Sequence, residues 1–360
     1  TTQMSQSFNL NQPLPKFSSR DVVEANRKYV DDRRKGLITS LKTKYPKLDA
    51  SLMGGIETDT ILCISALSGA GKSTIAKTVR DSIAKLNKSQ KFRQYIFNFE
   101  MIAHQQIGRS IVSDANMPLR DLYSVDTPLT DDQYAKLNDY YEDLAERDTS
   151  FIEVPSTPKH IADSIRYYWE KECKPTGAVM IYEIDHALLV KGREGQSEKN
   201  RIDDLMYALV DVKKWIASQG GHSVGIVLSQ MNREIKSVER RQHADMHRPD
   251  TSCLFGASSI EMCADYILFS HIPAKLGLQS YTEAKLPVRI KVDGKLMQMP
   301  YFELVKQRSG ASDLTIPLWN KLDRFDFDEM DKSIFEKIHR EFLEGECTVT
   351  PEVQAQYKLI

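Results

Sequence analysis

Residues 66–74, ALSGAGKST, combine small residues with a lysine and a hydroxyl in a pattern that can hold phosphate. Gly69 and Gly71 let backbone N–H groups approach phosphate oxygens, and the start of a following helix adds positive dipole. Lys72 would place positive charge on the β- and γ-phosphates, and Ser73 offers a hydroxyl to Mg²⁺. Ala66 stands where the pattern usually has its first glycine, and a small residue is enough at a strand exit. The predicted nucleotide-binding residues are Ser68, Gly69, Ala70, Gly71, Lys72, Ser73 and Thr74.

Two acids follow apolar runs that read as strands, at the strand ends where ligands of parallel sheets gather. Glu100 ends RQYIFNFE and suits the activation of a water molecule, while Asp185 ends GAVMIYEID and suits Mg²⁺ held through its water shell. Glu183 competes with Asp185, because it lies on the same strand face two residues earlier. Either acid alone is equally compatible with a solubilising strand end.

A fourth apolar run, GIVLSQ, ends at Gln230, whose amide can respond to a γ-phosphate or simply cap the strand. The polar segment after it is a candidate mobile loop that meets phosphates, with plain solvated surface as the alternative. Its basic residues are Lys236, Arg240, Arg241 and Arg248.

The elements that must carry these residues alternate between short apolar runs and longer helical stretches, which is typical of βαβ units and a mainly parallel sheet. The helix after the phosphate loop shows the expected period at Ile75, Val79, Ile83 and Leu86. Beyond about residue 285 the runs become short, which predicts antiparallel hairpins at the sheet edge. The predicted strands cover residues 61–66, 95–99, 178–184, 223–228 and 266–269.

The two ends of the chain differ from this central part. We predict a flexible arm over residues 1–18, a linker helix over 19–36 with a narrow apolar stripe, and an α/β domain over 37–327. Residues 328–360 are predicted to be an acidic tail around a short helix, with Ser333 and Glu336 resembling a capping box.

The composition gives no overall basic field, because 49 Lys and Arg nearly balance 50 Asp and Glu among 360 residues, so any contact with nucleic acid must come from a local patch or from backbone amides. The five cysteines show no metal-ligand spacing and are expected to be buried or incidental thiols in a reducing cytoplasm. No apolar run is long enough to span a bilayer and no signal-peptide pattern begins the sequence, so no membrane partner is expected.

The order of these motifs resembles the ATPase domain of DnaB-type hexameric replicative helicases, including phage-encoded relatives, over about residues 36–326. The resemblance runs through ALSGAGKST, FNFEMIAHQQIGRS, IDHALL, VLSQMNRE, SSIEMCADYILF, KQRSG and WNKLDRFDF. It implies a RecA-like core, and it favours Asp185 over Glu183 as the acid of the Mg²⁺ site. It also assigns Lys306 and Arg308, in KQRSG, to the γ-phosphate of a neighbouring subunit.

The same resemblance implies ATP and Mg²⁺ as cofactors, a homo-hexamer, single-stranded DNA as the track, and primase and a helicase loader as partners. Translocation in the 5′–3′ direction is expected. Catalytic roles fall on Lys72, Glu100, Gln230, Lys306 and Arg308. The expected DNA-binding residues are Asn232, Arg233, Lys236, Arg240, Arg241, Phe255, Gly256 and Ala257.

Two features depart from the family pattern. Phe255 occupies the position of the usual basic residue in the DNA-contacting loop, which leaves open whether this loop contacts DNA through its side chain or through backbone N–H groups. The helical domain that many members carry before the linker is not recognisable. The alternatives are a RecA-like recombinase, or another ATPase of this fold without unwinding activity.

Overall fold

The computed structural model describes residues 16–345 except 293, 309 and 311, and it leaves the side chain of Ala257 undescribed. The described chain divides into two compact units at Ser40 and Leu41. Most of the predicted arm, and the last part of the predicted tail with Cys347, lie outside the described residues. The other four cysteines are buried free thiols, as predicted: Cys63, Cys173, Cys253 and Cys263.

The first unit contains helix α1, Ser19–Arg34, where the sequence predicts one. Ser18 caps it through a reciprocal hydrogen bond with Asp21, and none of its residues is buried. Its apolar stripe, including Val22, Val23 and Val30, is therefore exposed.

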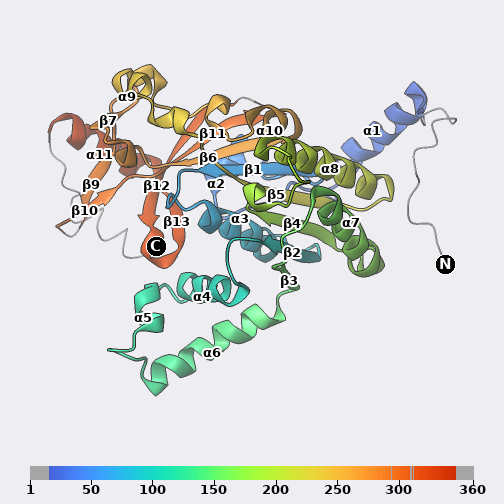
Figure 1. Ribbon diagram of the computed structural model, residues 1–360, viewed down its shortest axis with the longest axis horizontal. Coiled ribbons are helices and arrows are strands. Elements are labelled where there is room, and N and C mark those ends of the chain that lie inside the picture. The colour runs from blue at the N-terminus through green and yellow to red at the C-terminus, as the bar shows by residue number, and fades with distance from the viewer. Residues whose placement is uncertain (1–15, 293, 309, 311, 346–360) are drawn as a thin grey trace. The chain divides into compact units, whose positions relative to one another are not determined.

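The second unit is built on one nine-stranded sheet, with the order β13-β12-β11-β6-β1-β5-β4-β2-β3 (Figure 1). The six strands from β6 to β3 are mutually parallel, and β11, β12 and β13 extend the sheet in antiparallel fashion. This confirms the predicted RecA-like α/β class with antiparallel hairpins at the C-terminal edge. The sheet strands are β1 Thr60–Ala66, β2 Phe92–Asn98, β3 Thr149–Ile152, β4 Val179–Asp185, β5 Ser223–Gln230, β6 Tyr266–His271, β11 Tyr301–Gln307, β12 Leu314–Lys321 and β13 Asp326–Glu329.

Alternation along β1 divides the core between the two faces of the sheet. Ile61 and Cys63 belong to the cluster that contains α7 and α8, whereas Leu62 and Ile64 belong to the cluster that contains α3. The helices are α2 Pro46–Ser51, α3 Lys72–Leu86, α4 Ala103–Asp114, α5 Leu119–Tyr123, α6 Asp131–Glu146, α7 Pro158–Tyr168, α8 Glu198–Ser218, α9 Val238–Gln242, α10 Ala257–Cys263 and α11 Lys332–Leu343. On α3, Ile75, Val79 and Ile83 are buried as predicted, but Leu86 at the helix end is 53% exposed.

Smaller elements complete the unit. Helices α4, α5 and α6 form one excursion of the chain between β2 and β3 (Figure 1). Two short hairpins precede β11, pairing β7 Ser280–Tyr281 with β8 Leu286–Pro287 and β9 Arg289–Val292 with β10 Lys295–Gln298.

The segment predicted as the start of an acidic tail is part of the compact body. β13 pairs with β12, and Ile334 and Ile338 of α11 are buried in the main core. The predicted capping box at Ser333 is wrong, because Asp331 caps α11 and accepts the backbone N–H of Ser333 at 2.8 Å. Asp is as good an N-cap as Ser, and here it comes first along the chain.

Candidate functional site

The phosphate loop connects the carboxyl end of β1 to the first turn of α3. Gly69 and Gly71 have φ angles of 68° and 83°, in the left-handed region that favours glycine. A Cβ atom on Gly71 would lie 2.3 Å from Cε2 of Phe327, so this position also excludes every side chain sterically. α3 begins at Lys72, and the free N–H groups of its first turn therefore face the loop.

Asp185 lies beside this loop at the carboxyl end of β4. The hydroxyl of Ser73 donates a hydrogen bond to Oδ2 of Asp185 at 3.0 Å. Oδ1 of Asp185 is buried and has no hydrogen-bond partner among the described residues. Burial raises the pKa of Asp185, against the opposing charge of Lys72. A hydroxyl and a buried carboxylate oxygen with no partner are donors that suit a hydrated Mg²⁺ ion.

The competing acid, Glu183, has a different environment. Its Oε2 accepts a hydrogen bond from Nη1 of Arg80 at 2.6 Å, and its side chain is 2% exposed. Burial raises its pKa to about 7. Glu183 is therefore occupied by a structural ion pair, and Asp185 is the strand acid that contacts Ser73.

Glu100 lies just past the end of β2, and register places it next to Asp185. Asn98 pairs with Asp185 across the two strands, and the N–H of Phe99 donates to the carbonyl of Asp185 at 2.7 Å. The charges of Glu100 and Asp185 both act on the Lys72 ammonium, whose pKa is nevertheless lowered, mainly by burial. An exposed carboxylate at this point can contact a water molecule that approaches the γ-phosphate.

A buried histidine, which the sequence reasoning missed, lies between Asp185 and Gln230. His186 directly follows Asp185, its Nδ1 accepts the N–H of Leu188 at 3.1 Å, and its ring interacts with the side chain of Gln230. Burial and, to a lesser extent, the charge of Lys72 lower its pKa to about 4. The ring is thus neutral at physiological pH and joins the two strand ends. Its place directly after Asp185 was the available signal.

Lys275, a second residue that the sequence reasoning missed, contacts the backbone of the phosphate loop. It lies in the turn after β6, and its Nζ donates to the carbonyls of Gly69 at 2.6 Å and Ser68 at 3.3 Å. Because β6 pairs with β1, residues just beyond the end of β6 necessarily approach the loop. That strand order is not readable from spacing alone.

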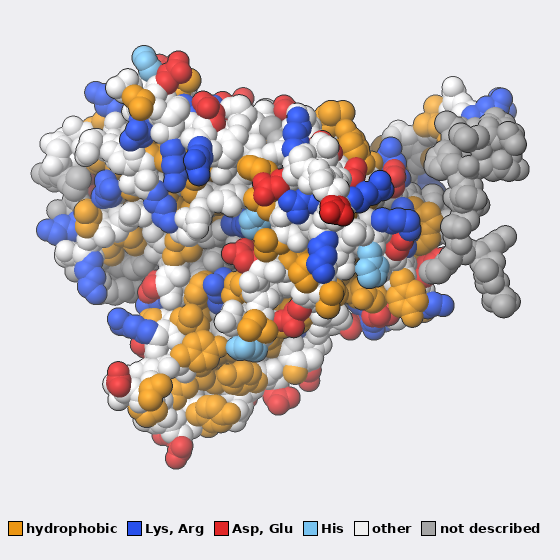
Figure 2. All heavy atoms as spheres, viewed as in Figure 1, with side chains coloured by type: hydrophobic (Ala, Val, Ile, Leu, Met, Phe, Trp, Pro, Cys, Tyr) orange, Lys and Arg blue, Asp and Glu red, His pale blue; other side chains and the backbone are white. Residues whose placement is uncertain are grey.

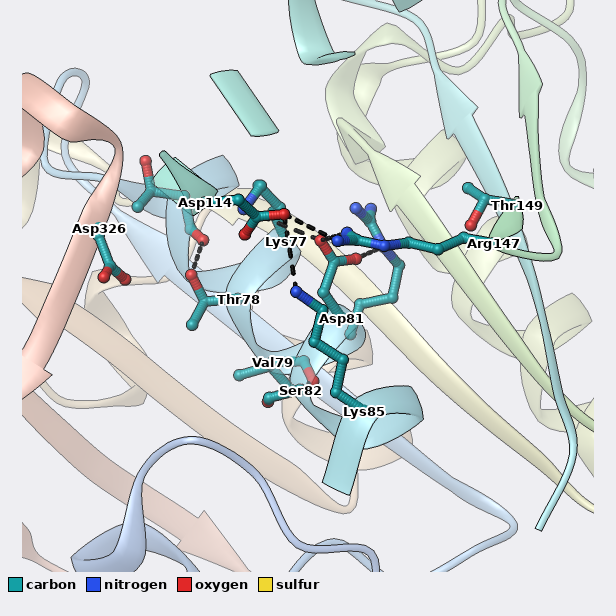
Figure 3. Close-up of polar contacts among 12 residues, drawn as sticks. Lys77, Thr78, Val79, Asp81, Ser82, Lys85, Asp114, Arg147, Thr149 and Asp326 are labelled. Atoms are coloured by element: carbon teal, nitrogen blue, oxygen red, sulfur yellow. Dashed lines mark hydrogen bonds and ion pairs between the residues drawn. The ribbon is translucent and has the colours of Figure 1, made fainter. Parts of the chain in front are cut away.

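Helix α3 is held by a cluster of charges that joins it to α4 and to the segment before β3 (Figure 3). Arg147 contacts Asp114 at the end of α4 at 2.7 Å and Asp81 on α3 at 3.3 Å. Lys77 and Lys85, also on α3, contact Asp81 at 3.8 Å and Asp114 at 3.6 Å. The cluster fixes the helix behind the phosphate loop relative to the chain segment that follows Glu100.

Arg109 of α4 belongs to the same region. Its guanidinium lies 4.7 Å from the ring centroid of Phe325, a cation–π contact, and both residues line a small pocket with Ser73 and Thr74. The pocket extends from the phosphate loop toward the chain segment before β13.

Lys306 and Arg308 lie on the opposite side of the sheet from the phosphate loop, near the amino end of β6. β11 runs antiparallel to β6, so Lys306 pairs with Ile267 at the amino end of β6. The phosphate loop follows Ala66, which pairs with Ser270 near the opposite end of β6. Ile267 and Ser270 are three residues apart, so at about 3.3 Å per residue these two positions lie about 10 Å apart along β6. These cations are thus separated from the phosphate loop of their own chain.

Arg240 is excluded as a free phosphate-binding side chain, contrary to the expectation. It is buried, and it donates to Asp250 at 2.5 Å, to Ser252 at 3.0 Å and to the carbonyls of Met246 and Arg248. Arg248 is likewise engaged, with Glu303 at 2.9 Å. Arg240 thus holds the loop together from inside, and Arg248 attaches the loop to β11.

Asn232 also has an internal role, because its side chain caps the turn at Glu234 and donates to the carbonyls of Ser252 and Leu254. The remaining basic residues of the predicted loop, Arg233, Lys236 and Arg241, are exposed. Basic side chains also gather on the face of the molecule shown in Figure 2, interspersed with acidic ones.

The loop at Phe255 is anchored to the end of β5. The N–H of Phe255 donates to the carbonyl of Gln230 at 3.1 Å, and its side chain packs against the main core. Gly256, with φ 75°, is the N-cap residue of α10. This connects the predicted DNA-contacting backbone directly to Gln230; of Ala257 only its place at the start of α10 is described.

Residues 40–326 match the family model of the DnaB-like helicase C-terminal domain. The fold is similar to that of a solved ATPase domain, with TM-score 0.69, 19% identity, and coverage of 88% of this chain and 100% of the other. It is also similar to a DnaB-like replicative helicase studied with its primase interactions, with TM-score 0.67, 18% identity, and coverage of 88% and 68%. No curated protein matches the sequence. Among the described helices, none has the length and apolarity needed to cross a bilayer.

Proposed function

We propose that this chain, which belongs to the DnaB-like helicase C-terminal domain family, works as a ring of six copies that moves 5′–3′ along single-stranded DNA. Membership of this family makes it a replicative DNA helicase, driven by ATP hydrolysis. The observation that carries the ring is the separation of Lys72 from Lys306 and Arg308 across the sheet. A second copy that brings its Arg308 edge to the phosphate loop of the first would complete each site.

The residues of one site then divide the work of phosphoryl transfer. Lys72 and the N–H groups of the phosphate loop bind the phosphates, and Ser73 with Asp185 would hold Mg²⁺, which supplies charge neutralisation of the phosphates when bound. Glu100 accepts a proton from the attacking water, and Gln230 contacts the γ-phosphate. Lys306 and Arg308 of the neighbouring copy stabilise the charge that develops on the transferred phosphoryl group.

We assign the contacts with DNA to the loops at the end of β5. The exposed Arg233, Lys236 and Arg241 contact phosphates through their charges, and the backbone around Phe255 and Gly256 contributes N–H groups. Such contacts are independent of base sequence, as a translocating motor requires. The near-neutral composition fits this assignment, because only the channel lining has to be positive.

Helix α1 is assigned to the assembly of the ring. Its apolar stripe is exposed, with Val22 55%, Val23 51% and Val30 56% accessible, which suits docking on a neighbouring copy. Deleting residues 1–36 is expected to abolish hexamers in light scattering. Unchanged hexamers would remove this role. Primase is a further partner that we propose, by analogy with the DnaB-like helicase that was studied with primase, and family membership leads us to propose a helicase loader as well.

The decisive experiment measures strand displacement on forked duplexes that carry either a 5′ or a 3′ single-stranded tail. ATP-dependent unwinding from the 5′ tail, together with ATPase stimulation by single-stranded DNA, is expected. Strand exchange without displacement would indicate a recombinase instead. ATPase activity without a DNA response would contradict the proposed motor.

A further inference from the structure

Both cations that we assign to the neighbouring site are docked on one short helix of their own chain. The ammonium of Lys306 donates to the carbonyl of Glu261, and Nη2 of Arg308 donates to the carbonyl of Met262 at 3.0 Å. Glu261 and Met262 belong to the last turn of α10, where carbonyl groups lack helical partners and the dipole is negative.

A buried carboxylate completes this arrangement. Oδ1 of Asp265 contacts Nε of Arg308 at 3.1 Å. Its other oxygen, Oδ2, accepts the N–H of Ile61 at 2.7 Å and Nζ of Lys213 at 2.6 Å. Asp265 is therefore fixed by β1 and by α8, and its side chain is only 8% exposed. Arg308 is thus attached to an immobile point of the fold.

The geometry leaves part of the guanidinium available. Nε and Nη2 of Arg308 are used inside the chain, and its side chain remains 51% exposed. A guanidinium is planar and rigid, so fixing one edge determines where the remaining N–H groups point. A long side chain that is already ordered has less entropy to lose when the phosphate of a neighbour arrives.

We propose that Asp265 is a positioning residue that holds Arg308 by its Nε edge and presents the rest of the guanidinium to the neighbouring subunit. The proposal rests on the proposed role of Arg308 in trans. Asp265 itself contacts neither nucleotide nor DNA. Its contribution is the preorganisation of a charge that acts in another chain.

A double-mutant cycle on steady-state ATPase, with saturating single-stranded DNA, tests the proposal. Asp265→Asn retains an oxygen for the N–H of Ile61 but loses the charge that holds Arg308. We expect kcat to fall about 10-fold. The KM for ATP should stay within about twofold, because the phosphate loop supplies most of the ground-state binding, whereas Arg308 acts on the charge that develops in the transition state. In an Arg308→Ala background, Asp265→Asn should cause no further loss.

Lys213→Met is the matched control, because it leaves Asp265 charged, in contact with Arg308, and still held at Oδ2 by the N–H of Ile61. It should keep kcat within about threefold of wild type. Arg308→Lys tests the same contact in a second way, because a lysine side chain has no Nε–H edge for Asp265 to hold. This variant should lose about as much as Asp265→Asn, and the two changes together should lose no more than either one. Light scattering and thermal melting check that each variant is folded and assembled.

The outcomes separate this proposal from the function on which it rests. An additive loss in the Arg308→Ala background would mean that Asp265 acts through general stability, and would overturn the proposal. Wild-type kcat in Asp265→Asn would overturn it as well. A fully active Arg308→Ala would instead remove the trans role of Arg308, and the positioning role with it.

Discussion

Lys72 and Arg308 lie at opposite strand ends of one continuous sheet, Lys72 beyond the carboxyl ends of the parallel strands β1 and β6 and Arg308 at the amino end of β6. Lys72 follows the carboxyl end of β1, whereas Arg308 follows β11 at the amino end of β6. A single chain thus presents one half of a phosphate site at the carboxyl ends of these strands and the other half at their amino ends. In a ring, the Arg308 side of one copy would meet the Lys72 side of the next. Each copy would then both supply a catalytic residue to one neighbour and receive one from the other.

Mixing two inactive variants is expected to restore ATPase activity. Lys72→Ala and Arg308→Ala should each lose on the order of 10³-fold or more in rate, because the first lacks the phosphate-binding lysine and the second lacks the finger. In an equimolar mixture, sites with Lys72 from one chain and Arg308 from another are intact. The rate of the mixture should therefore exceed the sum of the separate rates. The double variant Lys72→Ala/Arg308→Ala, mixed with either single variant, is the control that must stay inactive.

Two adjacent arginines in the loop after β5 should behave differently. Exposed Arg241→Ala should weaken single-stranded DNA binding and reduce the slope of log K against log salt by about 0.7, the contribution of one phosphate contact. Buried Arg240→Ala should instead leave Asp250 and two carbonyls without their donor, and cost about 2–3 kcal/mol of local stability. Fluorescence anisotropy across a salt series measures the first effect, and hydrogen exchange of the loop measures the second. A reversal of the two effects would contradict the assignment.

Removing Arg147 should loosen the segment that carries Glu100. Arg147→Ala leaves Asp114 and Asp81 with weaker partners in a site where the Arg147 side chain is only 14% exposed. We expect a loss of about 2–3 kcal/mol in the free energy of unfolding, measured by urea denaturation. Arg147→Lys keeps the charge but cannot bridge both carboxylates in the same way, and should lose about half as much. Equal stability of all three proteins would show that the cluster contributes nothing.

A buried histidine predicts how stability depends on pH. Neither ring nitrogen of His271 has a partner within the described part of the chain, and burial lowers its pKa to about 3 from an ordinary value of 6.5. Below pH 6.5 the unfolded chain binds a proton that the folded chain refuses, so this histidine reduces the free energy of unfolding as the pH falls. The effect is about 1.4 kcal/mol per pH unit, or about 2 kcal/mol at pH 5.

His271→Phe removes this group while keeping an aromatic ring beside Tyr281, whose ring centroid is 5.3 Å away. The variant should lose less stability than wild type between pH 7 and pH 5, as measured by denaturation at each pH. His186, whose pKa is lowered to about 4, remains in both proteins and cancels in the comparison. Parallel stability curves would show that His271 is protonated in the fold without cost.

Much of the fold was predictable because it depends on patterns local to the chain. The five predicted parallel strands and the helix after the phosphate loop are present, since apolar runs and helical period respond to burial alone. The short β3 was missed, because only its neighbours identify Thr149–Ile152 as a strand. α11 was placed in a tail for a related reason, since only tertiary packing shows that Ile334 and Ile338 are buried.

The functional site was likewise predictable only in part. The proximity of Ser73 to Asp185 follows from the motif and from the rule that ligands bind at the carboxyl ends of strands in parallel sheets. The roles of Arg240 and Lys275 did not follow, because a basic residue in a loop looks the same in sequence whether its partner is DNA, a buried aspartate or a loop carbonyl. Contacts between segments far apart in the chain decide that question, and spacing does not encode them.

The proximity of Gly71 to Phe327 joins an early segment of the chain to a late one, which suggests when during synthesis the nucleotide site is completed. Strand β1 needs β5 and β6 on either side, and the last loop glycine packs against a ring from β13. At about 5–20 residues per second, a ribosome needs tens of seconds to proceed from the loop to β13. The nascent chain carries an open, unsupported phosphate loop through that interval. We therefore expect nucleotide to stabilise chains that have been synthesised at least as far as β13.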